Sequence, residues 1–280
     1  MHTLRTTLLV LAATAPLAAQ TARQPDYAEA MHAAHGRELP TATPAATTAP
    51  RRAVTGSEVV YGTVNGRELR GYLSRPAGAE RGGPAIIVIH EWWGLNDNIK
   101  AVTDRYAGEG FTVLAVDLFG RVATTPDTAM VLYQAAMRDV PSGEANVRAA
   151  IAYLKGQGAT ALGSVGYCFG GHWSLRTGLT GGADMKGIVM YYGAPITDRT
   201  QLARLRAPVL GLFGGLDRGI PVDSVRAMEA QMKSMGRPVT IKVYSDANHA
   251  FANPSGQAYN AVAATDAWDL TLAFFRRTLR

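Results

Sequence analysis

The sequence has little cysteine, little charge and no long apolar run, and each shortage excludes a class of protein. A single cysteine among 280 residues cannot form an intramolecular disulfide, so a disulfide framework is excluded. No Cys and His residues have the spacing of a zinc motif, so no metal site and no other cofactor is predicted. The apolar fraction of 47% is ordinary for a globular protein, so one sizeable core is expected. The lone thiol is therefore either a buried core side chain, a site of unwanted oxidation or a catalytic group.

Charge of one sign is not concentrated anywhere in the chain. Lys and Arg total 28 against 22 Asp and Glu, a formal net charge of +6. Such an excess could favour nucleic acid or an anionic surface. The basic residues are scattered among acidic ones, however, and no Lys/Arg cluster is interleaved with aromatic residues. We therefore expect no nucleic-acid partner.

The N-terminus has the pattern of a secretory signal peptide over residues 1–19. Arg5 precedes a short apolar run, Leu8 to Ala15, and small residues follow up to Ala19. This pattern predicts export, to the periplasm or outside the cell. The run is too short to span a bilayer, so no stable membrane insertion is expected. The alternative is an amphipathic first helix of a protein that stays in the cytoplasm.

Residues 20–53 form a Pro/Ala/Thr-rich linker in this interpretation, with a short helix over Tyr27 to Leu39. Such a composition buries too little apolar surface to offset the entropy of ordering. His32 and His35 lie in this segment and could be metal ligands, but two isolated histidines in such a segment are more typical of solvated side chains. The folded domain is predicted over 54–280.

The domain has the pattern of an α/β fold. Val59 to Val64 and Glu68 to Leu73 flank Asn65-Gly66, a strong hairpin signal. Further strands are predicted over 85–90, 112–116, 164–167, 187–191, 209–213 and 240–244, and helices over 97–108, 127–137, 143–155, 173–179, 222–235 and 261–279. This alternation predicts a mostly parallel sheet with helices on both faces, preceded by an N-terminal β-hairpin. Ligands of such folds bind beyond the carboxyl ends of the strands.

The segment Gly166-Tyr-Cys-Phe-Gly-Gly171 joins a predicted strand to a predicted helix. It has the nucleophile-elbow pattern G-x-S-x-G of the α/β-hydrolase fold, with Cys168 in place of serine. The glycines suit a sharp turn that leaves no room for side chains at the flanking positions. A helix N-terminus also favours a thiolate. A buried cysteine in a glycine-rich turn is the alternative.

Two later residues complete the order that the elbow fold requires, in which the nucleophile is followed by an acid and then by a histidine. Asp217 comes just after the predicted strand 209–213, and His249 just after 240–244. A turn or helix-cap role for Asp217 and a loop role for His249 are the alternatives for each residue alone. Together with Cys168 they predict a catalytic triad.

A third strand end carries His90-Glu-Trp-Trp-Gly94. Gly94 occupies the second His position of H-E-x-x-H, so a zinc protease is not predicted. A loop at this place is suited to supply a backbone N–H to an oxyanion hole. We expect the N–H groups of Trp92 and Phe169 to form that hole, with Trp93 and Tyr167 in the pocket wall.

With these motifs, the sequence resembles the dienelactone hydrolase family of α/β-hydrolases over residues 54–280. The motifs that carry the resemblance are His90-Glu-Trp-Trp-Gly-Leu-Asn, Asp117-Leu-Phe-Gly-Arg121, Gly-Tyr-Cys168-Phe-Gly-Gly, Gly-Gly-Leu-Asp217 and Asn-His249-Ala-Phe-Ala. The resemblance implies that Cys168 is the nucleophile and that Glu91 holds and activates its thiol. It also implies that Arg121 binds a substrate carboxylate.

The sequence departs from the family pattern at Asn253. Family members that act on dienelactone carry a second carboxylate-binding arginine there, four residues after the catalytic histidine. The sequence therefore favours a small-molecule ester or lactone other than dienelactone itself, with Asn253 facing the substrate.

The predicted activity is hydrolysis of a carboxylic ester or lactone through a thioester acyl-enzyme, by a chain that is a monomer by default. A thioesterase or acyltransferase would use the same triad. An exported binding protein without catalysis would not need all three side chains, and a thiol-redox protein would normally need a resolving thiol, which the sequence lacks.

Overall fold

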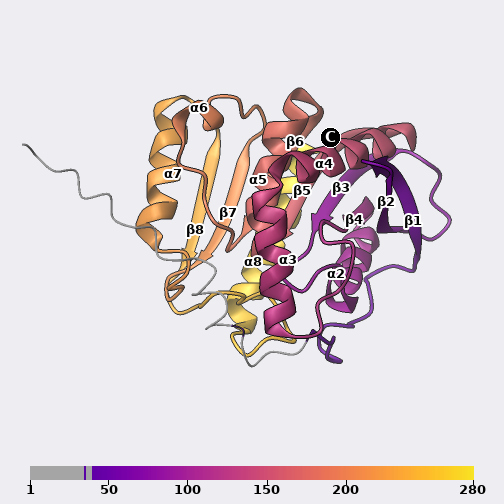
Figure 1. The fold of residues 1–280 in the computed structure, drawn as a ribbon, viewed down its shortest axis with the longest axis horizontal. Coiled ribbons are helices and arrows are strands. Elements are labelled where there is room, and N and C mark those ends of the chain that lie inside the picture. The colour runs from indigo at the N-terminus through magenta and orange to yellow at the C-terminus, as the bar shows by residue number, and fades with distance from the viewer. Residues whose placement is uncertain (1–34, 36–39) are drawn as a thin grey trace, which may run out of the picture.

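The computed structural model describes His35 and residues 40–280. Its centre is one eight-stranded sheet with helices packed along it (Figure 1). The strands are β1 (Val54–Val64), β2 (Arg67–Pro76), β3 (Gly83–Ile89), β4 (Thr112–Val116), β5 (Ala159–Tyr167), β6 (Met185–Tyr191), β7 (Val209–Gly214) and β8 (Val239–Tyr244). The predicted signal peptide lies outside the described residues, as does all of the predicted helix over 27–39 except His35.

The strand order is β1-β2-β4-β3-β5-β6-β7-β8. β1 and β2 pair antiparallel and β2 runs antiparallel to β4, whereas all later pairs are parallel. The hairpin turns at Asn65 and Gly66, whose φ angles of 51° and 75° suit the turn that an Asn-Gly pair favours. The α/β prediction with an N-terminal hairpin is confirmed.

Helices cover both faces of the sheet. They are α2 (Asp97–Gly108), α3 (Pro126–Arg138), α4 (Val140–Gly156), α5 (Phe169–Gly181), α6 (Arg199–Leu202), α7 (Val222–Ser234) and α8 (Ala261–Thr278), with a 3₁₀ turn at Gly182–Asp184. Neighbouring residues of a strand point to opposite faces. Gly163 of β5 faces Phe275 of α8, whereas Ser164 hydrogen-bonds to Ser174 of α5. These two helices therefore lie on opposite faces.

The predicted elements are present, and most strands and helices extend beyond the ranges that the sequence indicated. The strands β3 to β7 are buried along most of their length, which explains their near-continuous apolar sequences. The short helix α6 was not predicted, because four residues are too few for a helical pattern. Among the described residues, no helix is long and apolar enough to cross a membrane.

Residues 40–52, at the end of the predicted linker, contact the domain. Asn96 donates from Nδ2 to the carbonyl oxygen of Pro40 (3.0 Å), and the backbone N–H of Thr43 donates to Ser255 Oγ (2.9 Å). The Ala46 side chain is buried. This segment therefore lies against the loops that follow β3 and β8.

Candidate active site

Cys168 lies on a sharp turn between β5 and α5. Its φ of 57° is in the left-handed region, which costs a residue with a side chain on the order of 1–3 kcal/mol. A Cβ added at Gly166 would collide with the Gly170 carbonyl oxygen, and one at Gly170 with that of Ile89. The backbone N–H of Cys168 donates to Tyr191 O (3.0 Å), which ties the turn to the next strand. The structure thus has the close packing that the glycines predicted.

Asp217 and His249 meet at the carboxyl end of the sheet. The Asp217 Oδ2 atom lies 2.6 Å from Nδ1 of His249, and both side chains are almost fully buried. The other oxygen, Oδ1, accepts hydrogen bonds from the backbone N–H groups of Gly219 (2.8 Å) and Ile220 (2.9 Å). The carboxylate is therefore fixed at both ends, and it orients the imidazole.

Charge pairing dominates the electrostatics of this site. Burial lowers the pKa of His249, but the charges of Asp217 and Cys168 and hydrogen bonds to both outweigh that effect, so the pKa lies well above its ordinary value. Burial likewise raises the pKa of Asp217, yet its interactions with His249 and its two backbone donors bring that pKa below the ordinary range. The site therefore favours a charged imidazolium between two acidic groups.

Glu91 is buried next to this group, and its carboxylate is held by two side chains. Oε2 accepts a hydrogen bond from Nδ2 of Asn253 (2.8 Å), and Oε1 accepts one from the Tyr192 hydroxyl (3.4 Å). The Tyr192 ring also lies 5.1 Å from the His249 ring, centroid to centroid. Asn253, predicted to face the substrate, thus contacts Glu91 at the site.

Comparison with known proteins places this geometry in a family. The profile of the "Dienelactone hydrolase family" matches residues 69–279. The chain is 34% identical over 224 residues to "Protein usf" of Aquifex pyrophilus, which covers 77% of this chain and 96% of that protein. The chain belongs to the dienelactone hydrolase family. It is therefore a hydrolase of that family, and the resemblance stated from the sequence is confirmed.

One further relative agrees with the family, and one solved structure shares the fold. The chain is 29% identical over 262 residues to a protein of Saccharolobus solfataricus named "Putative carboxymethylenebutenolidase", covering 79% of this chain and 98% of that one. A solved "Dienelactone Hydrolase-like Promiscuous" phosphotriesterase from metagenomic libraries superposes with a TM-score of 0.75 at 24% identity, over 81% of this chain and all of the other. The latter likeness supports the α/β-hydrolase fold.

The loop after β3 is fixed by the buried side chain of His90. His90 Nδ1 donates to the Glu91 carbonyl oxygen (2.6 Å), and Nε2 accepts from the N–H of Leu118 (3.1 Å). Burial lowers the pKa of His90, although Asp117 acts in the opposite direction, and a neutral ring fits this pair of bonds. His90 therefore joins the loops after β3 and β4.

The four aromatic residues predicted for the oxyanion hole and the pocket wall lie in two groups. Trp92 and Trp93 are nearly fully buried, with ring centroids 4.9 Å apart, and Phe169 stacks on His90 at 5.5 Å. Phe169 is the first residue of α5, so its N–H has no acceptor within the helix. The Tyr167 hydroxyl instead shares a hydrogen bond with the Tyr106 hydroxyl (2.8 Å), in which either group can donate. This bond holds the Tyr167 side chain in the core.

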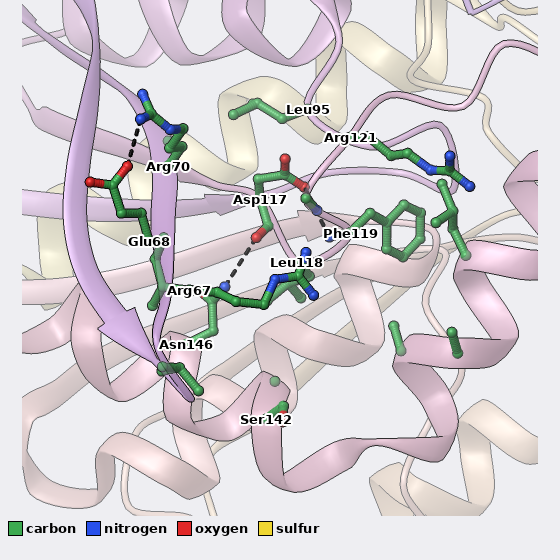
Figure 2. Close-up of a pocket in the computed structure, with 18 of the residues that line it drawn as sticks. Arg67, Glu68, Arg70, Leu95, Asp117, Leu118, Phe119, Arg121, Ser142 and Asn146 are labelled. Atoms are coloured by element: carbon green, nitrogen blue, oxygen red, sulfur yellow. Dashed lines mark hydrogen bonds and ion pairs between the residues drawn. The ribbon is translucent and has the colours of Figure 1, made fainter.

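Arg121 lines a cavity of about 710 Å³ bounded by β2, the loop after β4 and the helices α3 and α4 (Figure 2). Arg67 and Asp117 line it too, and Glu68 pairs with Arg70 at its edge. The described residues that line this cavity include none of the three triad side chains. The structure thus brings Cys168, Asp217 and His249 together beside the Glu91–Asn253 pair, and Arg121 lines a cavity that none of the three triad side chains lines.

His35 is the residue that the sequence did not assign to the site. The prediction of a solvated side chain is wrong, because His35 is 4% exposed. Its ring lies 5.3 Å from that of His249 and 5.2 Å from that of Trp92. It precedes the part of the chain that matches the family, and its position in a Pro/Ala/Thr-rich context gave no signal of burial.

Proposed function

We propose that this hydrolase cleaves carboxylic esters or lactones with Cys168 as nucleophile, His249 as general acid and base, and Asp217 as the group that orients His249. The 2.6 Å contact between Asp217 and His249 at the end of the sheet, beside a cysteine on a strained elbow, carries the proposal. The family and its relatives support the substrate class.

In the first half-reaction the Cys168 thiolate attacks the carbonyl carbon, and the carbonyl π electrons move to oxygen. The backbone N–H groups of Trp92 and Phe169 would bind this oxyanion, a contribution of about 3 kcal/mol for each donor. The tetrahedral intermediate collapses as the C–O bond to the leaving alkoxide breaks, and His249 supplies its proton. An alcohol leaves and a thioester on Cys168 remains; with a lactone, the alcohol stays part of the acyl group.

In the second half-reaction His249 removes a proton from water, and the resulting hydroxide attacks the thioester. The carbon–sulfur bond breaks, the carboxylic acid is released and the Cys168 thiolate is restored. Asp217 stabilises the imidazolium that forms in both halves. Glu91, held by Asn253 and Tyr192, is proposed to keep the thiol in place before the substrate arrives.

A panel of aryl esters, lactones and thioesters tests the nucleophile and the class together. Cys168→Ala is expected to lose hydrolysis of every substrate that the wild type cleaves, and mass spectrometry of the quenched wild type is expected to show an acyl group on Cys168. Hydrolysis at the wild-type rate by Cys168→Ala would refute the proposal. A much higher rate with thioesters, or transfer to an added alcohol, would instead favour a thioesterase or acyltransferase.

Arg121 is proposed to recognise a negatively charged group of the substrate that extends from the triad into the cavity that Arg121 lines. Arg121→Ala is compared with the wild type on a matched pair of esters, one neutral and one bearing a carboxylate. We expect kcat/KM to fall at least tenfold for the anionic ester and less than twofold for the neutral one. Equal losses on both esters would remove this role.

Export is likewise a proposal that rests on residues 1–19 alone. Expression in a Gram-negative host, followed by fractionation and N-terminal sequencing, tests it. A periplasmic protein that begins near Gln20 supports export, whereas an intact Met1 in the cytoplasmic fraction would contradict it.

A further inference from the structure

His35 lies against the proposed triad although it is far from the triad in sequence. It is buried, and its ring meets the His249 ring edge-on, with an interplanar angle of 74°. Pro40 and Thr43 are held at two neighbouring loops, since the Pro40 carbonyl oxygen accepts from Asn96 and the Thr43 N–H donates to Ser255. Ser255 Oγ in turn donates to Asn98 Oδ1 (2.8 Å). The chain from Pro40 to Thr43 is therefore anchored to the loops after β3 and β8.

Three metal-binding atoms converge at this point. One ring nitrogen of His35, one of His249 and the Cys168 sulfur all lie within 4.8 Å of one another, and all three residues are buried. Imidazole nitrogens and thiolates are both ligand types that Zn²⁺ takes in proteins. Typical bond lengths of about 2.0–2.3 Å put tetrahedral ligand atoms roughly 3.3–3.6 Å apart. Side-chain movements of about 1 Å would close the group around an ion.

We propose that His35, Cys168 and His249 bind a divalent zinc-type cation, with the fourth coordination position left to water or another small ligand. Asp217 supports this assignment, because its bond to Nδ1 of His249 directs the other nitrogen, Nε2, to the ion. A carboxylate on the far nitrogen of a metal-bound histidine is the usual outer-shell arrangement. The Cys168 thiolate and the Asp217 carboxylate together balance the double charge.

Binding of the cation would release a proton, because Cys168 ligates as the thiolate and His249 as the neutral imidazole. No bond to carbon forms or breaks, and no oxidant is needed. An occupied site ties up the side chains proposed as nucleophile and base, so the metal would hold the hydrolase in a reversible inactive state. The binding itself does not depend on the proposed catalysis, because only the three ligands are needed for it.

Cobalt(II) titration of the purified full chain in metal-free buffer tests the site without any substrate. We expect one equivalent of Co²⁺ to produce the visible bands of a four-coordinate ion and a near-ultraviolet thiolate-to-cobalt band. Zn²⁺ is expected to remove both by displacement. Cys168→Ser should lose the thiolate band, and His35→Ala should weaken binding at least tenfold. His32→Ala, which removes a histidine from the same segment, is the matched control and should bind as the wild type does.

His35→Cys guards against a misfolded alanine variant, because it retains a ligand and should restore binding with a stronger thiolate band. The proposal is overturned if the wild type shows no thiolate-to-cobalt band, if His35→Ala binds Co²⁺ within twofold of the wild type, or if His32→Ala weakens binding as much as His35→Ala. Loss of ester hydrolysis in Cys168→Ala with no Co²⁺ binding in the wild type would reject the metal site and leave the proposed function standing.

Discussion

Replacing Asp217 with asparagine isolates what the carboxylate contributes to the Asp217–His249 pair, because the two side chains have nearly the same shape. In the wild type Oδ1 accepts from Gly219 and Ile220, while Oδ2 faces His249. In the variant the amide oxygen takes the two backbone bonds, so the amide NH₂ faces Nδ1 of His249. Since an amide nitrogen only donates, Nδ1 must accept, and the imidazole proton moves to Nε2, which then cannot accept a proton from Cys168.

The size of the effect follows from the bond that is lost. A hydrogen bond to a charged group contributes about 1.5–3 kcal/mol, and each 1.36 kcal/mol is tenfold in rate. Loss of support for the imidazolium alone therefore lowers kcat roughly 10- to 150-fold, and the wrong tautomer adds to this. The pKa of His249, which Asp217 raises, should also fall.

The assay is kcat on an aryl ester, with the ring signals of His249 followed by NMR titration in the same proteins. Asp246→Asn is the matched control: it removes the same charge from an exposed position three residues before His249 and should leave both readouts unchanged. An Asp217→Asn protein with kcat within threefold of the wild type and an unaltered His249 titration would refute the reasoning.

The same pair makes stability depend on pH, and the sign follows from the two pKa shifts. The folded-state pKa of His249 is raised, so its contribution is complete below the unfolded value of about 6.5 and is lost as pH rises through the folded value. The folded-state pKa of Asp217 is lowered, so its contribution is present above about pH 3.9 and is lost as pH falls through the folded value. Urea unfolding should show that the advantage of the wild type over Asp217→Asn is greatest between about pH 4 and 6.5 and shrinks in alkali. A constant difference from pH 5 to 9 would contradict this.

Two further substitutions test the packing around the site by urea unfolding. Gly170→Ala should lower the free energy of unfolding by roughly 3 kcal/mol, because the new Cβ would overlap the Ile89 carbonyl oxygen. Gly156→Ala is the control: its Cβ would meet nothing within 4 Å, so it should be neutral or stabilising. Similar losses of stability for both variants would contradict the steric argument. Asn253→Ala should lower the free energy of unfolding by about 1.5–3 kcal/mol, because it removes a buried hydrogen bond to the Glu91 carboxylate. A loss below about 0.5 kcal/mol would contradict this and show that water replaces the amide.

The fold and the convergence of Asp217 and His249 were predictable because both depend on local patterns and on one rule of topology. The glycines at 166 and 170 mark a turn with no space for side chains, and this requirement is visible in the sequence. Residues that follow neighbouring parallel strands meet at the same edge of the sheet. The adjacency of β7 and β8 therefore joins side chains 32 residues apart.

Contacts that depend on where loops fold were not predictable. Nothing in the local sequence indicates that Asn253 hydrogen-bonds to Glu91, or that the Tyr167 hydroxyl meets that of Tyr106 in the core. Nor does it indicate that His35 is buried, or that Pro40 and Thr43 hydrogen-bond to distant loops. Such pairings have no periodicity, so composition alone suggested a solvated segment.

His35 lies in a part of the chain that the family profile does not match. The family profile begins at residue 69, while His35, Pro40 and Thr43 precede it. One side of the candidate site thus comes from residues outside the range that the family profile matches. Substitutions in this short stretch would change the contacts that His35 makes with His249 and Trp92, while the strands and helices of the hydrolase keep their sequence. His35 is therefore separate in sequence from the strands and helices that position Cys168, Asp217 and His249.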